Sequence, residues 1–466
     1  MSLTTSLYTG RSALVTRQTQ MSVIGNNIAN ADRVGYHRQT AKIVENYPIN
    51  NRRYQTGTGS HVETVMREFD AALEANLRTS YEQEAYYEQI SKYAQATEEV
   101  MAIEGKSIMT DSLTEFANSL QDLANNPASE IERRAFLSNS ERVAASFNQQ
   151  HVLLTDLRDR IASSSTDGVI PGEVTQFNTL TAELANLNNQ ISSVEQSYIR
   201  DDQQAIEFRD QRDQVVSELA KLADVTVVEE TDGSYTLSVG SETIVDIGTG
   251  VYGDLTFTHT AGTPPTIAFG WSHTATVPTL NAGGLQGLSD SFDFVQGRLT
   301  DFEAYASTFA SQMNLLHGAG YDITGPPPSL GGQLFNALVP GQMTVSITDP
   351  DEVAASDNQT NVGDGDNALN MWNGLQNPLV AIGNDSLIDR ADRMVDFVAI
   401  ERNKAEGLHR SSQNSVELFK GVIAEKSGVS IDEEMVDMLE TQRAFQGAAK
   451  FISTVDELVQ TVINLI

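Results

Sequence analysis

The residues that decide the fold are the last in the chain, residues 430–466, which read SIDEEMVDMLETQRAFQGAAKFISTVDELVQTVINLI. Ser430 is a residue type that caps helices, and the acidic residues after it suit the positive end of a helix dipole. Apolar residues then recur at alternating spacings of three and four, which predicts a long helix with a coiled-coil seam. The predicted seam consists of Phe445, Ala448, Ile452, Val455, Val459, Val462 and Ile466.

This terminal helix is expected to need a partner. Six of its seven seam residues are large, and burying each is worth roughly 1.5 to 3 kcal/mol. The seam therefore releases on the order of 10 kcal/mol, whereas ordering about thirty backbone residues costs about 1 to 2 kcal/mol each. Because the seam continues to Ile466, we expect the partner surface to extend to that residue.

The first thirty residues carry a matching apolar pattern. Four of these residues follow one another at intervals of seven, and two lie on the companion positions of the same seam. Gly10 and Arg17 fall on the companion row and weaken an isolated helix. The predicted amino-terminal seam consists of Leu3, Leu7, Leu14, Met21, Ile24 and Ile28. We therefore expect the two terminal helices to pair with each other.

Between the termini, helical patterns surround a β insert. An extended stretch is expected through about residue 60. Residues 65–223 have few helix breakers and predict three or four long antiparallel helices. Asp232 and Gly233 separate two β-branched or alternating runs, which is a hairpin signal. Helical patterns return at about 288–317, 367–382 and 385–426, and residues 343–347 are a further candidate strand.

The predicted fold class is mainly α with a β insert, in an elongated multidomain molecule. Residues 1–35 and 430–466 are expected to form a terminal coiled-coil domain. Residues 36–223 and 285–429 are expected to form a long-helix bundle with extended segments, and residues 224–284 one small outer β domain. Because matching seams lie at opposite ends of the sequence, we expect both termini at one end of the molecule and the β domain at the other.

The composition excludes several classes of function. Thirty Lys and Arg against 63 Asp and Glu give a net charge of −33, which repels nucleic acid and anionic lipid. The chain contains no cysteine, so disulfides and thiolate chemistry are excluded. We find neither a cleavable signal peptide nor an apolar run long enough for a membrane span, so no membrane insertion is expected.

The residues that follow the first helix resemble a signature of the flagellar rod, hook and hook-associated axial protein family. They are Asn26-Asn27-Ile28-Ala29-Asn30, followed by Gly35-Tyr36 and Arg38-Gln39. The sequence departs from the commonest form at Asp32, Arg33 and Val34. Asparagine tolerates the left-handed backbone that ends helices, and glycine supplies a flexible position. We interpret Asn26, Asn27, Asn30, Gly35 and Tyr36 as a joint between the terminal helix and the body.

Three further phrases resemble the hook-associated members, and hook-associated protein 1 sequences in particular, rather than hook or rod proteins. The phrases are residues 209–219 (RDQRDQVVSEL), the glycines of residues 283–288 (GGLQGL) and residues 428–434 (GVSIDEE), which run on through Gln442, Ala444 and Phe445. Together they cover the final helix and both edges of the β insert.

The resemblance implies a structural, non-enzymatic component of the bacterial flagellum. It implies self-assembly as a ring of identical subunits at the junction between hook and filament, next to hook protein and hook-associated protein 3. It further implies type III export to the extracellular flagellum without a cleaved signal, and an export chaperone that binds the carboxy-terminal region. A joint at residues 26–36 would let subunits adapt between a curved hook and a straighter filament.

Several rival motifs fail on their context. Gly248, Gly250 and Gly253 have dinucleotide-binding spacing, but the residues that follow are strand-like, so turns are the better interpretation. A loop crowded with acids lacks the spacing of an EF-hand. These acids are Asp349, Asp351, Asp364 and Asp366. The seven histidines are scattered and form no zinc pattern. We therefore assign no catalytic, cofactor-binding or metal residues and expect no cofactor.

Other functions remain open from the sequence alone. Seams at both ends also suit a cytoplasmic coiled-coil scaffold, although the β insert and the asparagine phrase disfavour it. Another axial protein of the same family, such as hook-associated protein 3, a hook protein or a rod protein, is a further alternative.

Overall fold

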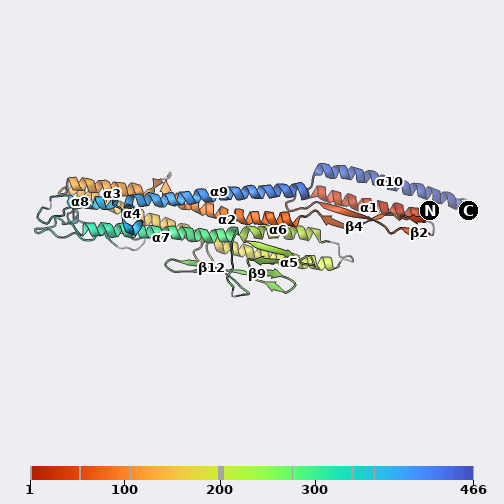
Figure 1. The fold of residues 1–466 in the computed structure, drawn as a ribbon, viewed down its shortest axis with the longest axis horizontal. Helices are drawn as coiled ribbons and strands as arrows, with labels where there is room; N and C mark the ends of the chain where they lie inside the picture. Colours follow the sequence, from red (N-terminus) through yellow and green to blue (C-terminus); the bar gives the residue numbers. More distant parts are fainter. Residues whose placement is uncertain are drawn as a thin grey trace.

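The computed structural model describes residues 3–51, 54–103, 106–197, 204–274, 276–336, 341–361 and 363–464. The molecule is a long, mainly helical rod (Figure 1), and the N and C labels lie together at one end of it. The expected fold class, mainly α with a β insert, is confirmed.

Ten α-helices are described. They are α1 (Leu3–Ala29), α2 (Ala71–Met101), α3 (Ile108–Asn125), α4 (Glu130–Ile161), α5 (Val169–Ser197), α6 (Ile206–Leu222), α7 (Gly283–His317), α8 (Asp366–Gln376), α9 (Leu387–Ser427) and α10 (Ile431–Asn464). Five helices, rather than three or four, therefore occupy the stretch before the β insert. Asp70, Ser129 and Ser386 cap α2, α4 and α9 by accepting hydrogen bonds from backbone amides of the first turn.

The strands are short and antiparallel. They are β1 (Gln39–Glu45), β2 (Ile49–Asn51), β3 (Tyr54–Thr56), β4 (Ser60–Arg67), β5 (Ala102–Ile103), β6 (Lys106–Ser107), β7 (Val225–Glu229), β8 (Tyr235–Val239), β9 (Glu242–Asp246), β10 (Val251–Tyr252), β11 (Leu255–Thr260), β12 (Thr266–Trp271), β13 (Phe335–Asn336) and β14 (Thr344–Val345). The insert holds a four-stranded sheet in the order β10-β9-β8-β7 and the hairpin β11-β12. The turn expected at Asp232 and Gly233 joins β7 to β8, and Gly233 has the φ of +80° that such a turn favours.

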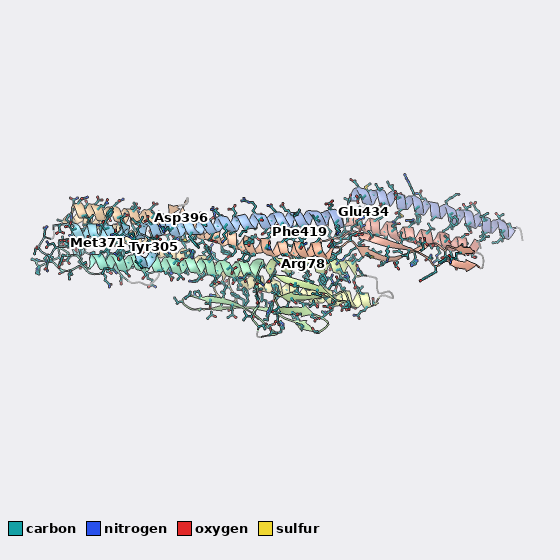
Figure 2. The ribbon with its side chains drawn as sticks, viewed as in Figure 1. Arg78, Tyr305, Met371, Asp396, Phe419 and Glu434 are labelled. Carbon is teal, nitrogen blue, oxygen red and sulfur yellow. The ribbon has the colours of Figure 1, made fainter. Side chains whose placement is uncertain are left out.

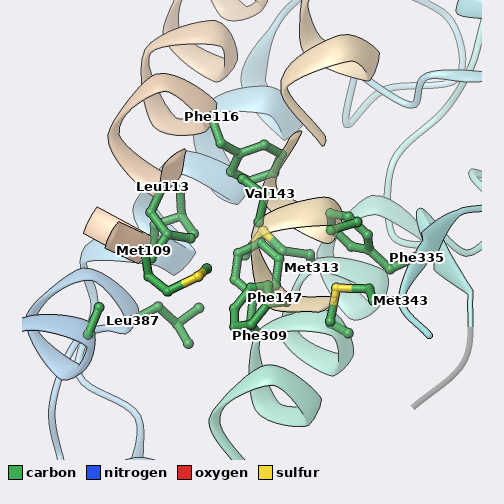
Figure 3. Packing of buried hydrophobic residues seen from close by; sticks show 14 of the residues in the cluster. Met109, Leu113, Phe116, Val143, Phe147, Phe309, Met313, Phe335, Met343 and Leu387 are labelled. Atoms are coloured by element: carbon green, nitrogen blue, oxygen red, sulfur yellow. The ribbon is translucent and has the colours of Figure 1, made fainter. Parts of the chain in front are cut away.

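An aromatic core fills the end of the rod that lies far from the termini. Phe116 of α3, Phe147 of α4 and Phe309 of α7 are at most 2% exposed, and their rings are within contact distance of one another or of shared neighbours. Figure 3 shows these side chains converging with Met313 and Phe335 between the helices. Figure 2 places Tyr305 and Met371 in the same part of the molecule. This close packing fixes the far end of the rod.

The β unit of residues 224–284 lies beside the middle of the rod (Figure 1), not at the end opposite the termini. The expectation of an end position was wrong because α7, which follows the insert, is 35 residues long and runs on to the far end, where it meets α3, α4 and α8. Phe177 of α5 and Trp271 of β12 belong to a second core cluster, which holds the β unit against α5, α6 and α7.

Close glycine contacts fix the two edges of the insert. Gly283, with φ of +85°, lies so near the end of α6 that an added Cβ would come within 2.6 Å of the Ala223 Cα. A Cβ on Gly287 would come within 2.6 Å of the Tyr86 backbone oxygen in α2. The glycine phrase therefore allows α7 to begin in direct contact with two other helices.

The extended residues after α1 lie along that helix. Strands β1 and β4 pair with each other and pack on α1, and Thr16 donates a hydrogen bond to the Ser60 carbonyl at 3.0 Å. Figure 1 shows β4 beside α1 near the two termini. This part of the segment grouped with the helical bundle therefore lies with the terminal helices instead.

Candidate functional site: the joint between the terminal helices and the body

The helices α1 and α10 lie side by side and antiparallel, as the two apolar patterns predicted. Val455 and Ile24 are buried, and most other seam residues are partly buried. The partly buried ones are Leu3, Leu7, Leu14, Met21, Ile28, Phe445, Ala448, Ile452 and Val459. Val462 is 45% exposed, which departs from the predicted seam. Ile466 lies outside the described residues.

The register of the pair explains the exposure of Val462. A Cβ added to Gly10 would lie 2.5 Å from the Ile452 Cγ1, so Gly10 faces Ile452 at close range. Counting in opposite directions from this contact places Leu3 beside Val459. Val462 therefore lies beyond Leu3, the first described residue of α1. Gly10, expected to weaken the helix, is therefore a position where the two helices approach closely.

Several large apolar residues of α10 are about half exposed, and we call five of them the outer residues. They are Met435, Leu439, Phe451, Leu458 and Val462. The periodicity of the sequence assigned Val462 to the seam and did not identify the other four. Their successive spacings of 4, 12, 7 and 4 residues place them on more than one side of the helix. The Phe451 ring also approaches Gly10 of α1, whereas Leu439 and Leu458 remain available to other chains.

The asparagine phrase forms a bonded cluster at the inner end of α1. Asn27 is 1% exposed, and its amide nitrogen donates to the Gln39 carbonyl at 2.9 Å and to the Glu434 carboxylate at 3.0 Å. Its amide oxygen accepts from the Tyr36 hydroxyl and from the Gln39 backbone amide, both at 2.9 Å. All hydrogen-bonding positions of the Asn27 side chain are therefore used.

Glu434 links α10 to the same cluster. The carboxylate is 1% exposed and accepts from the Arg38 Nε at 2.6 Å as well as from Asn27. Figure 2 shows Glu434 near the start of α10, where that helix follows α9. The Arg38 backbone amide donates to the Ser427 carbonyl at the end of α9, 2.9 Å away. One carboxylate and one arginine thus tie together α1, α9 and α10.

The remaining joint residues are held less tightly. The Asn30 amide nitrogen donates to the Asn26 backbone and side-chain oxygens, both at 2.9 Å, and Asn26 donates to the Gln39 side chain at 3.2 Å. Gly35 is exposed and has φ of +76°. The cluster around Asn27 is therefore a fixed point, and residues 30–35 form the looser connection next to it.

Two clefts flank this connection. One, of about 740 Å³, lies between α1 and the start of α6 and is lined by Gly25, Ala29 and Phe208 among others. The other, of about 460 Å³, lies between the connection, α2, α6 and α9, and is lined by Gly35, Tyr81 and Lys420 among others. These clefts separate the connection from parts of α1, α2, α6 and α9 that lie beside it.

Buried ion pairs join the same segment to the body. The Arg67 Nη1 donates to Asp210 at 2.8 Å and to Asp213 at 2.6 Å, while the His37 Nδ1 lies 2.9 Å from Asp210. The His37 Nε2 lies 3.5 Å from Glu74 of α2. The described side chains of these residues are at most 11% exposed. Charges this deeply buried are stable only while they stay paired.

These pairs predict a pH dependence of the joint. Burial alone would lower the pKa of His37, but the hydrogen bonds to Asp210 and Glu74 raise it to about 9, with Arg67 as an opposing charge. In the unfolded chain histidine titrates near pH 6.5. Protonated His37 therefore stabilises the joint fully below about pH 6.5, and this contribution is lost as the pH rises towards about 9.

We expect amide protection factors of residues 36–39 to fall severalfold between about pH 6 and about pH 9.5, measured by hydrogen exchange. A chain carrying His37→Gln should lose most of this dependence. An equal fall in both proteins would show that His37 is not the titrating group.

The rival motifs of the sequence occupy ordinary positions. Gly248 and Gly250 lie in the turn between β9 and β10, and the element that follows Gly253 is the strand β11, not a helix. The carboxylates of Asp364 and Asp366 lie close to that of Asp357, and Asp357 and Asp366 are exposed. Asp349 instead caps a short 3-10 helix. In the part of the chain that the structure describes, no helix is both long and apolar enough to cross a membrane.

Comparison with known families defines the class of protein. A family described as flagella basal body rod protein matches residues 7–37, and the carboxy-terminal part of the flagellar basal body rod FlgEFG proteins matches residues 421–465. These stretches contain most of α1 and all of α10, together with the joint. The paired terminal helices and their joint are thus those of a flagellar axial protein.

The flagellar hook-associated protein FlgK helical domain matches residues 94–335, just over half of the chain. The chain belongs to the FlgK family of flagellar hook-associated proteins. It is a structural component of the extracellular flagellar axis, at the junction between hook and filament, and it assembles with other axial components.

Individual relatives agree with this assignment. The chain is 25% identical to flagellar hook-associated protein 1 of Bacillus subtilis, over 98% of this chain and 97% of the relative. It is 29% identical to the Salmonella typhimurium protein of the same name, over 74% of this chain but 64% of that longer relative. The flagellar hook junction protein FlgK from Burkholderia pseudomallei has a similar fold, with a TM-score of 0.59 and 16% identity over 78% of this chain and all of that chain.

Proposed function

We propose that the chain forms a ring of identical subunits between hook protein and hook-associated protein 3. The observation that carries this proposal is the exposure of the outer residues of α10. The seam of α10 packs on α1, which leaves Leu439 and Leu458, 53% and 52% exposed, for neighbouring subunits. Apolar residues outside the seam suit a tube in which each helix touches both its own partner and other subunits.

Charges placed at two of the outer residues, Leu439 and Leu458, should block assembly without unfolding the chain. In Leu439→Glu/Leu458→Glu we expect the thermal stability of the purified chain to change little, because both side chains are exposed. We expect cells that carry this variant to lack flagellar filaments, since a charge buried between subunits costs several kcal/mol. Electron microscopy of cells measures the filaments.

The matched control is Gln446→Glu, which adds a charge to the same helix at an exposed polar position. Normal filaments are expected with this control. Normal filaments in the double leucine variant would contradict the proposed contact.

We also propose three structural units. The sequence predicts a terminal unit of residues 1–35 and 430–466, a helical body of residues 36–223 and 285–429, and an outer β unit of residues 224–284. Because β1 and β4 pack on α1, we propose this division with residues 39–67 placed in the terminal unit instead of the body. The seam residues named from the sequence are the assembly positions of this proposal. Of the joint residues, Asn26, Asn27 and Tyr36 hold the fixed end of the joint, and Asn30 and Gly35 are its hinge positions.

Before assembly, no neighbouring subunit covers the outer residues of α10. We propose that an export chaperone binds this carboxy-terminal region and that the chain leaves the cell through the flagellar type III channel, without a cleaved signal. The apolar character of the outer residues supports a chaperone at this region, because exposed apolar surface promotes aggregation.

The joint, we further propose, lets subunits adapt between a curved hook and a straighter filament. The two clefts beside residues 30–35 support this role. In Asn30→Ala/Gly35→Ala, the Asn26 oxygens lose the Asn30 side-chain amide as a donor, and alanine is strained at the positive φ of residue 35. We expect reduced swimming in soft agar.

As a control, Gly421→Ala changes a glycine of α9 that has open space around it, and it should swim normally. Wild-type swimming of the double variant would count against an adaptive joint.

A further inference from the structure

Helix α6 begins with an unusual concentration of buried charge. Arg209, Asp210 and Asp213 are 5% to 6% exposed, and Arg212 is fully buried. The two arginines are three residues apart, as are the two aspartates, so each pair lies along one face of the helix. The two faces contact different parts of the molecule.

The arginine face holds the turn of the β7–β8 hairpin. Arg209 donates to Glu195 of α5 at 2.6 and 2.9 Å and to Glu229 at the end of β7 at 2.5 Å. Arg212 donates to the Gly233 carbonyl in the turn, and its guanidinium lies 3.2 Å from the centre of the Tyr235 ring. The outer β unit is therefore anchored to α6 through its first hairpin.

The aspartate face holds the joint. Asp210 and Asp213 share the Arg67 guanidinium at the end of β4, and Asp210 also contacts His37. His37 precedes Arg38, which is bound to Glu434 of α10. The terminal helices are therefore connected to the opposite face of the same two turns of α6.

The two faces are also joined to each other. The Arg212 Nη2 and Nε lie 3.3 and 3.4 Å from the Asp213 Oδ1, and the other oxygen of Asp213 accepts from Arg67. Charged contacts thus run without interruption from the Gly233 carbonyl through Arg212, Asp213 and Arg67. If one of these buried groups moves, its neighbour is left without a partner, and that is costly.

We propose that the β7–β8 turn and the joint are energetically coupled through α6, so that a contact which shifts the outer β unit changes how firmly the terminal helices are held. The coupling does not depend on the proposed ring or its neighbours. It is a property of the single chain, and by linkage it must act in both directions.

Two similar turns of the β unit provide a matched test. The Asp232 carboxylate accepts hydrogen bonds from the Ser234 amide and hydroxyl in the turn held by Arg212. The Asp246 carboxylate accepts from the Gly248 amide and the Thr249 hydroxyl in the turn between β9 and β10, so its hydrogen bonds stay within that turn. Asp232→Ala and Asp246→Ala should each loosen their own turn by a comparable amount.

The readout is hydrogen exchange of the full-length chain, followed by mass spectrometry. For Asp232→Ala we expect exchange at the Arg38 and Gln39 amides to rise at least about fivefold, the lower end of common coupling factors. Asp246→Ala should leave these amides unchanged, and α3 should stay protected in both variants. If Asp232→Ala loosens its turn and leaves residues 38–39 as protected as in the wild type, the proposal is wrong.

A second variant, changed at the joint and measured at the turn, tests the coupling without any change at residue 232. Arg67→Gln changes a side chain of β4 that donates to Asp210 and Asp213. Exchange at the Gly233 and Ser234 amides should rise by a similar factor while α3 stays protected. Unchanged protection of that turn would also overturn the coupling.

Discussion

Replacing Glu434 with alanine is expected to detach α10 from the body. Glu434 is 1% exposed, and its carboxylate accepts hydrogen bonds from both Arg38 and Asn27. Removing one partner of a buried charge pair costs about 3 to 5 kcal/mol, and Arg38, whose side chain is 28% exposed, places the expected loss near the lower end. Hydrogen exchange across α10 should rise by about a hundredfold, since every 1.36 kcal/mol is about tenfold.

Asp437→Ala is the matched control for this variant. Asp437 lies one turn later on α10 and contacts the same arginine at 3.3 Å, but its side chain is 49% exposed. Such an exposed pair is worth about 0 to 1 kcal/mol. If Glu434→Ala and Asp437→Ala change the exchange of α10 equally, the burial of Glu434 has no special role.

The helices and their apolar faces could be predicted from the sequence because both depend on local pattern. The alternating spacings from Phe445 to Val459 and the hairpin signal at Asp232 and Gly233 correspond to real elements. The exposed end of the seam at Val462 could not be predicted, since it depends on the register between two helices 400 residues apart in sequence. About that register the periodicity of a single helix carries no information.

The polar centre of the joint was beyond sequence reasoning for a different reason. Glu434 follows Asp432 and Glu433, which are exposed, and nothing in that acidic run distinguishes the one carboxylate that is buried. The same holds for Asp210 and Arg212 in a charged phrase that reads as a solvated helix. Burial of these groups is a tertiary property, fixed by partners as distant as Arg67 and Arg38.

The side position of the β unit was also not predictable. Two helical segments flank the insert, and their order says nothing about how far each continues beyond it. The close contacts of Gly283 and Gly287 fix where α7 starts, and its length then carries the chain past the insert to the aromatic core. The resemblance to axial proteins drew attention to these glycines, but only the packing explains why glycine is required there.

Removing residues 444–466 should have the largest effect on function. The truncation deletes every seam residue of α10, including Ile452 opposite Gly10 and the buried Val455. The remaining part of α10, little more than a dozen residues, is too short to be stable as an isolated helix. Residues 3–29 would then lose their partner helix, and the outer residues Phe451, Leu458 and Val462 would be removed as well.

The central claim is that the terminal helices, paired with each other and with neighbouring subunits, hold the flagellar axis together at this position. The most direct measurement is the amount of flagellin in filaments and in the culture medium of cells whose chain ends at residue 443. The account predicts no filaments, with flagellin lost to the medium. Intact filaments and little free flagellin would contradict it.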